Sequence, residues 1–336
     1  MPSEEKYARR SAGELREVLP PDDVIFGNSA VMAGLRNRAS RVCGTGVHLL
    51  LYGHAGTGKE VLARWIHAKS GYPTGHFVSI NCAAIPSALL ESELFGYEKG
   101  AFTGANTGKA GKCELAHNGT LFLDEIEDLD LGLQSKLLHF LQDGSFSHIG
   151  GDAEIRVNTQ IICATSKDLE EEVAAGRFRS DLYHRINVMQ LRLPRLRERK
   201  EDIPVLAEHF REQYAKKFGK ESKPLGEDML KRLQEKEWRG NLRELANCIA
   251  RHVLIGPEAA MGEEQSPKHK DGRPSLAGQG SRVSLKHITR EAIRELERSV
   301  ILGALRANRW NRRKTASALK ISYRTLIYKI HKAGFS

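Results

Sequence analysis

Short apolar runs alternate with amphipathic stretches through residues 22–194, and this alternation predicts the fold of that part of the chain. The runs at 47–52, 120–123 and 159–165 are almost uniformly apolar, as strands buried on both faces of a parallel sheet are. The stretches between them have apolar residues at helical spacing. Strands and helices in regular succession are typical of a parallel α/β domain, which we expect over residues 22–194.

A different pattern follows between residues 195 and 256, where apolar positions keep helical spacing and no strand-like run occurs. This predicts a small all-helical domain. Residues 257–283 are rich in Gly, Pro, Ser and charge, which predicts a flexible linker. Helical patterning returns over 284–336, and residues 1–21 remain as a short N-terminal extension. A chain of 336 residues is long enough for several domains.

Charge is distributed unevenly between these segments. Residues 284–336 contain thirteen Lys and Arg and three Asp and Glu, a net charge of +10 that equals the net charge of the whole chain. The rest of the chain therefore holds as many acids as bases. A basic helical segment on a neutral body predicts nucleic-acid binding at this end. A solvated basic tail is the alternative, and the helical periodicity disfavours it.

Composition disfavours several other classes of protein. No apolar run approaches about 18 residues, so we expect no membrane span. The charged start, MPSEEKYARR, lacks the apolar core of a signal peptide. The five cysteines are scattered without a CxxC pair, which is typical of reduced thiols in a cytoplasmic protein and disfavours a structural metal site.

The sequence GHAGTGKE at residues 53–60 follows the first predicted strand and precedes a helical pattern. This is the context of a GxxxxGK phosphate-binding loop (P-loop), in which backbone N–H groups and a helix N-terminus surround phosphate oxygens. Lys59 would reach the β- and γ-phosphates. Glu60 stands where the general pattern has a Ser or Thr ligand for Mg²⁺. A glycine-rich connector is the alternative interpretation.

Two acids end the second apolar run, in GTLFLDE at residues 119–125. At the carboxyl end of a parallel strand they would point into the ligand crevice, Asp124 to hold Mg²⁺ and Glu125 to polarise an attacking water. A helix N-cap pair is the alternative, and the P-loop about sixty residues earlier disfavours it. The two motifs together predict ATP and Mg²⁺ as ligands.

The sequence GYEKGAFTGANTG at residues 96–108 has too many glycines for a helix interior and lacks strand alternation, so we expect a mobile loop. Phe102 and Thr103 lie near its middle. A mobile loop that bears one exposed aromatic ring suits contact with a protein partner. A phenylalanine packed back onto its own domain is the alternative.

The segment ELFGYEKGAFTGA, with GHAGTGKE before it and GTLFLDEI after it, strongly resembles the sigma-54-dependent transcriptional activators, the bacterial enhancer-binding proteins of the AAA+ class. The similarity continues through FRSDLYHRINV, LRLPRLRERKEDIP and WRGNLREL, and GAFTGA is its most diagnostic motif. It covers about residues 22–256 and 284–336. The resemblance implies an α/β AAA+ P-loop domain with a parallel sheet, an α-helical lid and a C-terminal all-α, Fis-type helix-turn-helix domain.

The resemblance also implies roles for individual residues. Those implied in nucleotide binding are Gly53, Gly56, Thr57, Gly58, Lys59, Glu60, Thr165, Ser166 and the lid sensor Arg243. Those implied in catalysis are Glu125, its switch partner Asn81, the Mg²⁺ ligand Asp124 and two arginine fingers, Arg179 and Arg185. The loop implied in sigma-54 contact comprises Gly100, Ala101, Phe102, Thr103, Gly104 and Ala105. Because arginine fingers act on the ATP of a neighbouring subunit, a ring is implied, by family a hexamer.

Three residues depart from the family pattern. Ser166 stands where Asn is usual in the first sensor, Arg239 where Pro is usual, and His54 where an acid is common. A serine can still form hydrogen bonds, so we expect changed rather than absent ATPase activity.

Near the C-terminus two short helical segments flank a tight turn, and Ser322 would cap the second of them. This is a helix-turn-helix pattern that resembles the Fis-type domain. The residues expected to face base edges are Tyr323, Arg324, Thr325 and Tyr328. Those expected to contact phosphates are Arg312, Arg313, Lys329 and Lys332. A basic helical hairpin that serves dimerisation alone is the alternative.

We therefore expect an ATP-driven activator of sigma-54 RNA polymerase in the bacterial cytoplasm. It would bind enhancer double-stranded DNA as dimers, form a ring and move its GAFTGA loop against sigma-54 to open the promoter. A DNA-binding regulator with a relic nucleotide domain and an AAA+ remodeller with another client are the alternatives. Only about twenty residues precede the ATPase region, so we expect no receiver domain. Control would come from a separate protein, from expression level or not at all, unless the sequence is a part excised from a longer protein.

Overall fold

The structure is a computed structural model that describes residues 19–72, 74–256 and 314. The chain divides into two compact units, residues 1–262 and 263–336, and the description below concerns the first. The predicted linker at 257–283 lies outside the described residues, and so do all the predicted DNA-binding residues between 312 and 332.

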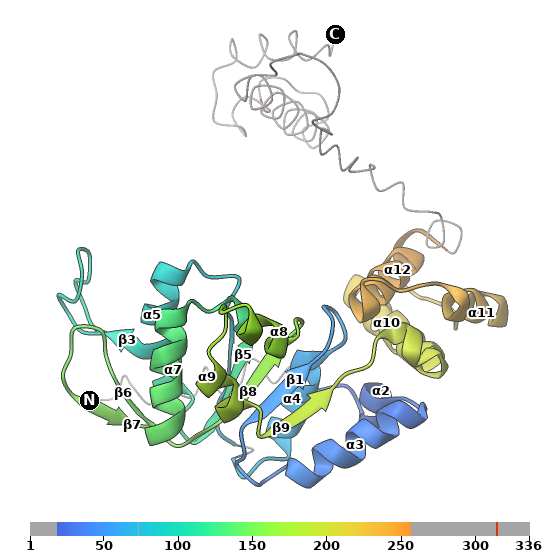
Figure 1. Cartoon of the computed structure of the whole chain (residues 1–336). Helices are drawn as coiled ribbons and strands as arrows, with labels where there is room; N and C mark the ends of the chain where they lie inside the picture. Colours follow the sequence, from blue (N-terminus) through green and yellow to red (C-terminus); the bar gives the residue numbers. More distant parts are fainter. Residues whose placement is uncertain (1–18, 73, 257–313, 315–336) are drawn as a thin grey trace, which may run out of the picture. The chain divides into compact units, whose positions relative to one another are not determined.

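A five-stranded sheet forms the centre of the first unit (Figure 1), and every neighbouring pair of its strands is parallel. In spatial order the strands are β2 (Phe77–Asn81), β5 (Gly119–Asp124), β8 (Thr159–Thr165), β1 (Leu49–Tyr52) and β9 (Met189–Arg192). The first predicted strand begins two residues later than its apolar run, at Leu49. The prediction of a parallel α/β domain is confirmed.

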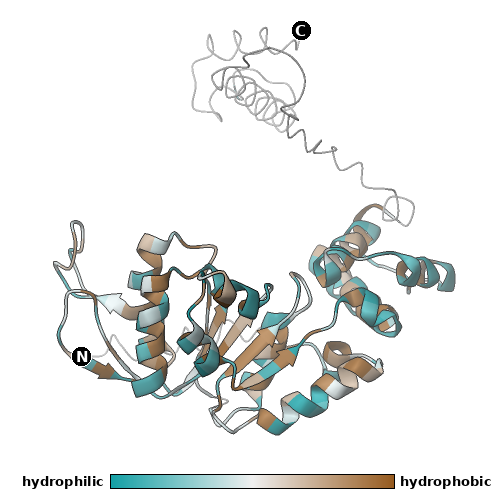
Figure 2. Cartoon of the chain, viewed as in Figure 1, coloured by the Kyte–Doolittle hydropathy of each residue, from teal (hydrophilic) through white to brown (hydrophobic). Residues whose placement is uncertain are grey.

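Helices cover both faces of this sheet because side chains alternate between the faces along each strand. In β1, Leu49 and Leu51 enter one apolar core and Leu50 enters the other. The helices on the Leu49 face are α2 (Asp22–Phe26), α3 (Ala30–Val42) and α4 (Lys59–Ala68). Those on the Leu50 face are α5 (Ser87–Phe95), α6 (Lys112–Leu115), α7 (Leu131–Asp143), α8 (Leu169–Ala174) and α9 (Ser180–Ile186). Figure 2 shows the strands as the most hydrophobic part of this arrangement.

A separate apolar core holds the helical region that follows the sheet. Its helices are α10 (Ile203–Phe218), α11 (Glu227–Glu235) and α12 (Asn241–Ile255), which follow the short 3-10 turns η2 (Leu196–Glu198) and η3 (Lys200–Asp202). Trp238 is buried here, and its indole N–H donates to the carbonyl of Leu233 at 2.8 Å. Among the described helices, none has both the length and the apolar character required to cross a membrane.

Two short antiparallel hairpins extend from the α/β region at the end where α5 and α7 lie (Figure 1). The first joins β3 (Gly96–Tyr97) to β4 (Lys109–Ala110), and the second joins β6 (Ser145–Ser147) to β7 (Glu154–Arg156). A bridge between Tyr97 and Ile149 connects the two hairpins. The loop at 96–108 therefore begins and ends on a short sheet instead of being open along its whole length.

Candidate functional site

The P-loop connects β1 to the first residue of α4. Gly56 and Gly58 have φ values of +75° and +103°, a left-handed backbone that residues with a Cβ adopt only at a cost. Lys59 opens α4, and its ammonium donates to the carbonyl of Gly53 at 2.8 Å across the loop. The loop is thus closed on itself, with its backbone N–H groups at the N-terminus of a ten-residue helix.

The acids predicted to act on nucleotide stand at the carboxyl edge of the same sheet. Asp124 ends β5 and is opposite Asn81, the last residue of β2. Burial raises the pKa of the Asp124 carboxyl, while the Lys59 charge opposes that rise. Burial likewise lowers the pKa of the Lys59 ammonium, and the Asp124 charge is the largest opposing influence. The two groups were predicted from motifs far apart in the sequence. In the structure they lie close enough for each charge to shift the pKa of the other group.

Glu125 follows with φ of +56°, a left-handed conformation that costs a non-glycine residue about 1–2 kcal/mol. Such strain is concentrated at functional sites. Its side chain caps no helix, because η1 (Ile126–Asp128) is a three-residue turn without a side-chain cap and Asp130 caps α7. The absence of a capping hydrogen bond from Glu125 disfavours the alternative of an N-cap pair.

The other predicted catalytic residues bond within their own surroundings. Asn81 Oδ1 accepts from the N–H of Ala84 at 2.9 Å, and no hydrogen bond joins it to Glu125. Arg179 forms a two-bond ion pair with Asp181, at 3.0 and 2.7 Å. The Arg185 guanidinium donates to the carbonyl of residue 141 at 3.0 and 3.2 Å. Arg179 precedes α9 and Arg185 lies within it, so one short helix positions both.

Two residues predicted in nucleotide binding have side-chain hydroxyl groups that support the loop. Thr165 is 1% exposed, its hydroxyl donates to the Lys167 carbonyl, and its own carbonyl accepts from Gly53 N–H at 3.1 Å. Thr57 is 2% exposed and its hydroxyl donates to the His54 carbonyl at 2.8 Å. Both side chains are buried inside the protein, so their hydroxyl groups hold the backbone of the site.

The helical region lies directly on the P-loop. The N–H of Leu242 donates to the Gly56 carbonyl at 2.9 Å, and a Cβ at Gly56 would lie 2.5 Å from the carbonyl of Gly240. The buried amide of Asn241 donates to Ala55 O and accepts from Leu196 N–H, each at 2.9 Å. The stem of Arg243, the predicted lid sensor, lies over Gly56, 3.4 Å from where that Cβ would be.

Arg199 is a residue of this region that the sequence motifs missed. It is 2% exposed and donates to the carbonyl of Thr57 at 2.9 Å. Burial lowers the pKa of the Arg199 guanidinium to about 10, although the nearby Asp202 charge opposes the change. Asp202 in turn accepts three hydrogen bonds from Asn28 and Ser29. This network links the P-loop to the chain before α3.

A cavity of about 480 Å³ opens beside the P-loop, a volume within the usual range for small-molecule sites. Thr57 and Gly58 line it on the loop side. Side chains from α2, α3, α4, α10 and α12 line most of the remainder, and the majority are apolar, among them Ile25, Phe26, Leu206, Phe210 and Leu242. An apolar slot next to a phosphate-binding loop suits the base of a nucleotide. No motif in the sequence marks it, because its walls come from five separate helices.

The three departures from the family pattern have identifiable surroundings. Ser166 donates to the Glu127 carboxylate from both its N–H and its hydroxyl. Arg195 contacts the ring of His54, and burial together with the Arg195 charge lowers the pKa of that imidazole. Arg239 is exposed.

The predicted contact loop is packed against itself at Ala105 and exposed to solvent at Phe102 and Thr103. Ala105 is 5% exposed, and its carbonyl accepts from Gly100 N–H at 2.9 Å, so it closes the loop. Thr103 is exposed, and Phe102 is 46% exposed while its ring lies 4.9 Å from that of Tyr97. The structure thus combines the two alternatives, since Phe102 has one ring contact and a large free surface.

The base of the loop is tied to the second hairpin through His148. Its imidazole lies 2.7 Å from the Glu98 carboxylate and 3.2 Å from that of Glu114. Burial opposes the charged form, but the hydrogen bonds and charges of the two glutamates outweigh it and raise the pKa of His148.

Three family models match the chain. One described as the Sigma-54 interaction domain matches residues 25–192, the AAA+ ATPase lid domain matches 197–282, and the bacterial regulatory protein, Fis family, matches 292–332.

Curated relatives match along most of this chain. The response regulator protein PilR of Pseudomonas aeruginosa is 40% identical over 323 residues, which are 95% of this chain and 71% of that protein. The regulatory protein AtoC of Escherichia coli is 40% identical over 311 residues, 92% of this chain and 68% of the relative. The DNA-binding transcriptional regulator NtrC of Escherichia coli is 39% identical over 332 residues, 94% and 71% of the two chains.

Solved structures agree with these matches. Crystal structures of NtrX from Brucella abortus in complex with ADP and with ATP are 32% identical to this chain, with TM-scores of 0.66 and 0.67. They cover 98% of this chain and 74% and 73% of the NtrX chains. The chain belongs to the sigma-54-dependent transcriptional activators, with their AAA+ ATPase domain, lid and Fis-type DNA-binding domain.

Proposed function

We propose that this activator hydrolyses ATP at the P-loop and uses the energy to remodel sigma-54 RNA polymerase. The observation that carries the proposal is the convergence of Lys59, Asp124 and the lid on one closed phosphate loop. Backbone N–H groups of residues 53–59 would hold the phosphates, Lys59 would balance the β- and γ-phosphate charge, and Glu125 would polarise the attacking water. Crystal structures of NtrX with ADP and ATP support a nucleotide at this site.

The residues present also fit a magnesium ion. Asp124 offers a carboxylate at the carboxyl end of β5, within the electrostatic reach of Lys59, and hard oxygen ligands are those Mg²⁺ prefers. The ion would neutralise charge on the β- and γ-phosphates when bound. Glu60 pairs with Arg64 at 2.8 Å. It would lie near the ion, but it is not the Ser or Thr that usually binds Mg²⁺ at this position of a P-loop.

The remaining site residues would sense and complete the nucleotide complex. Asn81 would switch between its present bond to Ala84 and Glu125, which follows the opposite strand. Arg243 would reach a phosphate from the lid, since its stem already lies over Gly56. The purine base would occupy the apolar cavity beside the loop.

Arg179 and Arg185 would act across a subunit interface. Within the chain, the Arg179 guanidinium is bonded to Asp181 and that of Arg185 to a carbonyl of α7. Head-to-tail contacts that close form rings, and the ring expected by family is a hexamer. Each finger would exchange its present acceptor for the γ-phosphate of the neighbour's ATP, which stabilises transition-state charge.

The loop at 100–105 would bear on sigma-54. Phe102 and Thr103 are its exposed non-glycine residues, whereas the buried Ala105 holds the loop closed. Gly100 and Gly104 have positive φ values and would allow the tip to change conformation as nucleotide state changes. Movement of this tip against sigma-54 would promote opening of the promoter.

The segment matched by the Fis family model would bind enhancer DNA as dimers. Tyr323, Arg324, Thr325 and Tyr328 would face bases, and Arg312, Arg313, Lys329 and Lys332 would contact phosphates. Such a protein would work at the DNA in the bacterial cytoplasm.

Steady-state ATP hydrolysis against protein concentration tests the ring and the site together. Turnover per subunit should rise steeply with concentration and be lost in Glu125→Ala and Arg179→Ala. Arg177→Ala is the matched control, because this neighbouring exposed arginine pairs only with Glu172 through its side chain. Turnover that is independent of concentration, or equally lost in all three variants, would contradict the shared site.

Transcription from a sigma-54 promoter tests the loop. Thr103→Ala should abolish activation while ATP turnover remains, whereas Thr107→Ala, an exposed threonine of the same loop, should change neither. Normal activation by the Thr103→Ala variant would contradict the proposed role of the loop in contacting sigma-54. Background ATP turnover by the wild type, with ATP still bound, would favour the regulator with a relic nucleotide domain.

A further inference from the structure

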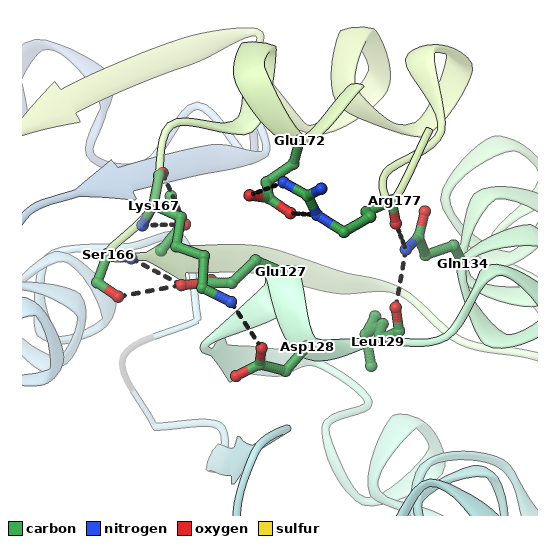
Figure 3. Close-up of polar contacts among 9 residues, drawn as sticks. Glu127, Asp128, Leu129, Gln134, Ser166, Lys167, Glu172 and Arg177 are labelled. Carbon is green, nitrogen blue, oxygen red and sulfur yellow. Dashed lines mark hydrogen bonds and ion pairs between the residues drawn. The ribbon is translucent and has the colours of Figure 1, made fainter. Parts of the chain in front are cut away.

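A third acid stands at the carboxyl edge of the sheet, beyond the two that the motifs predict. Glu127 belongs to the short turn η1 after β5 and is 7% exposed. Its Oε1 accepts two hydrogen bonds from Ser166, one from the N–H and one from the hydroxyl, both at 3.1 Å (Figure 3). Ser166 follows β8, the strand next to β5 in the sheet. Glu127 therefore joins the acidic turn to the sensor segment.

The second oxygen of this carboxylate is the unusual feature. Glu127 Oε2 is buried and has no hydrogen-bond partner in the structure. A buried acceptor left without a donor destabilises the folded protein, more so when it is charged, so each such atom calls for an explanation. The Glu127 charge acts on the nucleotide residues, where it adds to the burial that raises the pKa of Asp124 and opposes the burial that lowers the pKa of Lys59. The geometry agrees, because the carboxylate holds Ser166 and the preceding residue, Thr165, accepts a hydrogen bond from the P-loop N–H of Gly53 at 3.1 Å. The unpartnered oxygen is therefore assigned to the edge of the nucleotide site.

The ligand set around Asp124 indicates what this oxygen would receive. The position after Lys59 is Glu60, which is exposed and paired with Arg64, so no hydroxyl ligand is supplied there. Mg²⁺ keeps several of its waters in protein sites, and carboxylates beyond the direct ligands orient them. A site with one evident carboxylate ligand depends on such orientation more than a site with two.

We propose that Glu127 is a positioning residue for the magnesium–nucleotide complex, with Oε1 holding Ser166 and Oε2 accepting a hydrogen bond from a magnesium-bound water. The inference rests on the proposed hydrolysis of ATP with Mg²⁺. It assigns Ser166 a role through Glu127 and explains how a serine serves where the family usually has asparagine: it anchors the carboxylate.

The chain offers a matched control in the same two segments. Asp128 is the next residue of η1, and it pairs with Lys167, the residue after Ser166, at 3.0 Å on the exposed surface (Figure 3). Both carboxylates thus connect the turn after β5 to the segment after β8. If Glu127 merely tied these segments together, neutralising either carboxylate would have a comparable effect.

Magnesium titration of nucleotide binding is the deciding experiment, made on the full chain with a fluorescent ATP analogue. Glu127→Gln should raise the Mg²⁺ concentration for half-maximal binding about tenfold. In EDTA its affinity for the analogue should equal or exceed that of the wild type, because a negative charge near the phosphates is removed. Asp128→Asn should change the Mg²⁺ midpoint less than twofold. Glu127→Asp, which keeps the charge but is too short to serve both Ser166 and a water, should shift it in the same direction and provides the test if Glu127→Gln does not fold.

Turnover gives the second readout. Glu127→Gln should lower kcat about tenfold at saturating Mg²⁺, and adding Ser166→Ala should lower it no further, since Ser166 acts through Glu127. An unchanged Mg²⁺ midpoint in Glu127→Gln, or an equal shift in Asp128→Asn, would overturn the proposal. These outcomes are separable from failure of the proposed function: a wild type that binds Mg²⁺ and nucleotide without turnover fails only as an ATPase, because the midpoint shift needs no hydrolysis.

Discussion

Replacing Asn241 should show how tightly the lid is joined to the P-loop. Asn241 is 1% exposed and has φ of +52°. Its amide satisfies Leu196 N–H, which belongs to a fully buried residue, and Ala55 O, which belongs to an exposed one. Leaving the buried N–H without an acceptor costs about 1–3 kcal/mol, and losing the second bond costs about 0.5–1.5 kcal/mol.

Two substitutions separate these contributions from the backbone strain. Asn241→Gly loses the hydrogen bonds but adopts the left-handed conformation freely, so its free energy of unfolding should fall by about 2–4 kcal/mol. Asn241→Ala loses the same hydrogen bonds and also keeps the left-handed strain, which destabilises the folded state by about 1–2 kcal/mol. Alanine restricts the unfolded chain more than glycine does, and this offsets the strain by about 0.4–1 kcal/mol. Alanine should thus be the less stable variant by about 1 kcal/mol.

Thermal unfolding by circular dichroism and equilibrium binding of an ATP analogue would check this reasoning. A loss of 2–4 kcal/mol should lower Tm by about 5–15 °C for a unit of this size. Analogue affinity should fall in both variants because the lid is released from the loop. An Asn241→Gly variant with wild-type Tm and affinity would refute the importance of the amide, and an alanine variant as stable as the glycine one would refute the strain argument.

Two further predictions concern groups outside the motifs. The raised pKa of His148 means that its bonds to Glu98 and Glu114 contribute stability that is complete below the ordinary histidine pKa of about 6.5 and is lost as pH rises through the higher pKa in the folded protein. The difference in Tm between wild type and His148→Gln should therefore be largest near pH 6 and shrink by pH 8.5, and a difference that does not vary with pH would contradict this. Arg199→Ala should lower the free energy of unfolding by about 2–5 kcal/mol, because it empties a fully buried site and releases the Thr57 carbonyl. Urea unfolding would measure it, and a loss under 1 kcal/mol would show that the site collapses or admits water.

The sequence was sufficient to predict the parallel sheet, because strands buried on both faces leave uninterrupted apolar runs such as 159–165. It also located Lys59 and Asp124, whose side chains lie where local motifs predict. It could not reveal the bond between Asn241 and Ala55, which are separated by 186 positions, or that between Arg199 and Thr57, separated by 142. No periodicity or motif encodes such pairs, since tertiary packing alone brings them together.

Thr165 and Glu127 illustrate the same limit at the level of a single side chain. The family resemblance implied Thr165 in nucleotide binding, and only the structure shows that its hydroxyl bonds to the carbonyl of Lys167. Glu127 was one more acid in an acidic turn, and its significance depends on burial and on Ser166, neither of which a sequence pattern reports.

Helix α12 has one end on the P-loop and the other at Ile255, immediately before the stretch of chain that continues to the Fis-type segment. Fifteen helical residues span about 22 Å as a rigid rod. A displacement of α12 at Ile255 would therefore change the contact between the lid and Gly56 at the other end of the helix. By thermodynamic reciprocity, any ligand that favours one seating of α12 on Gly56 changes nucleotide affinity by the same factor by which nucleotide changes the affinity for that ligand. The seating of the lid and the occupancy of the P-loop would then depend on each other through a single helix.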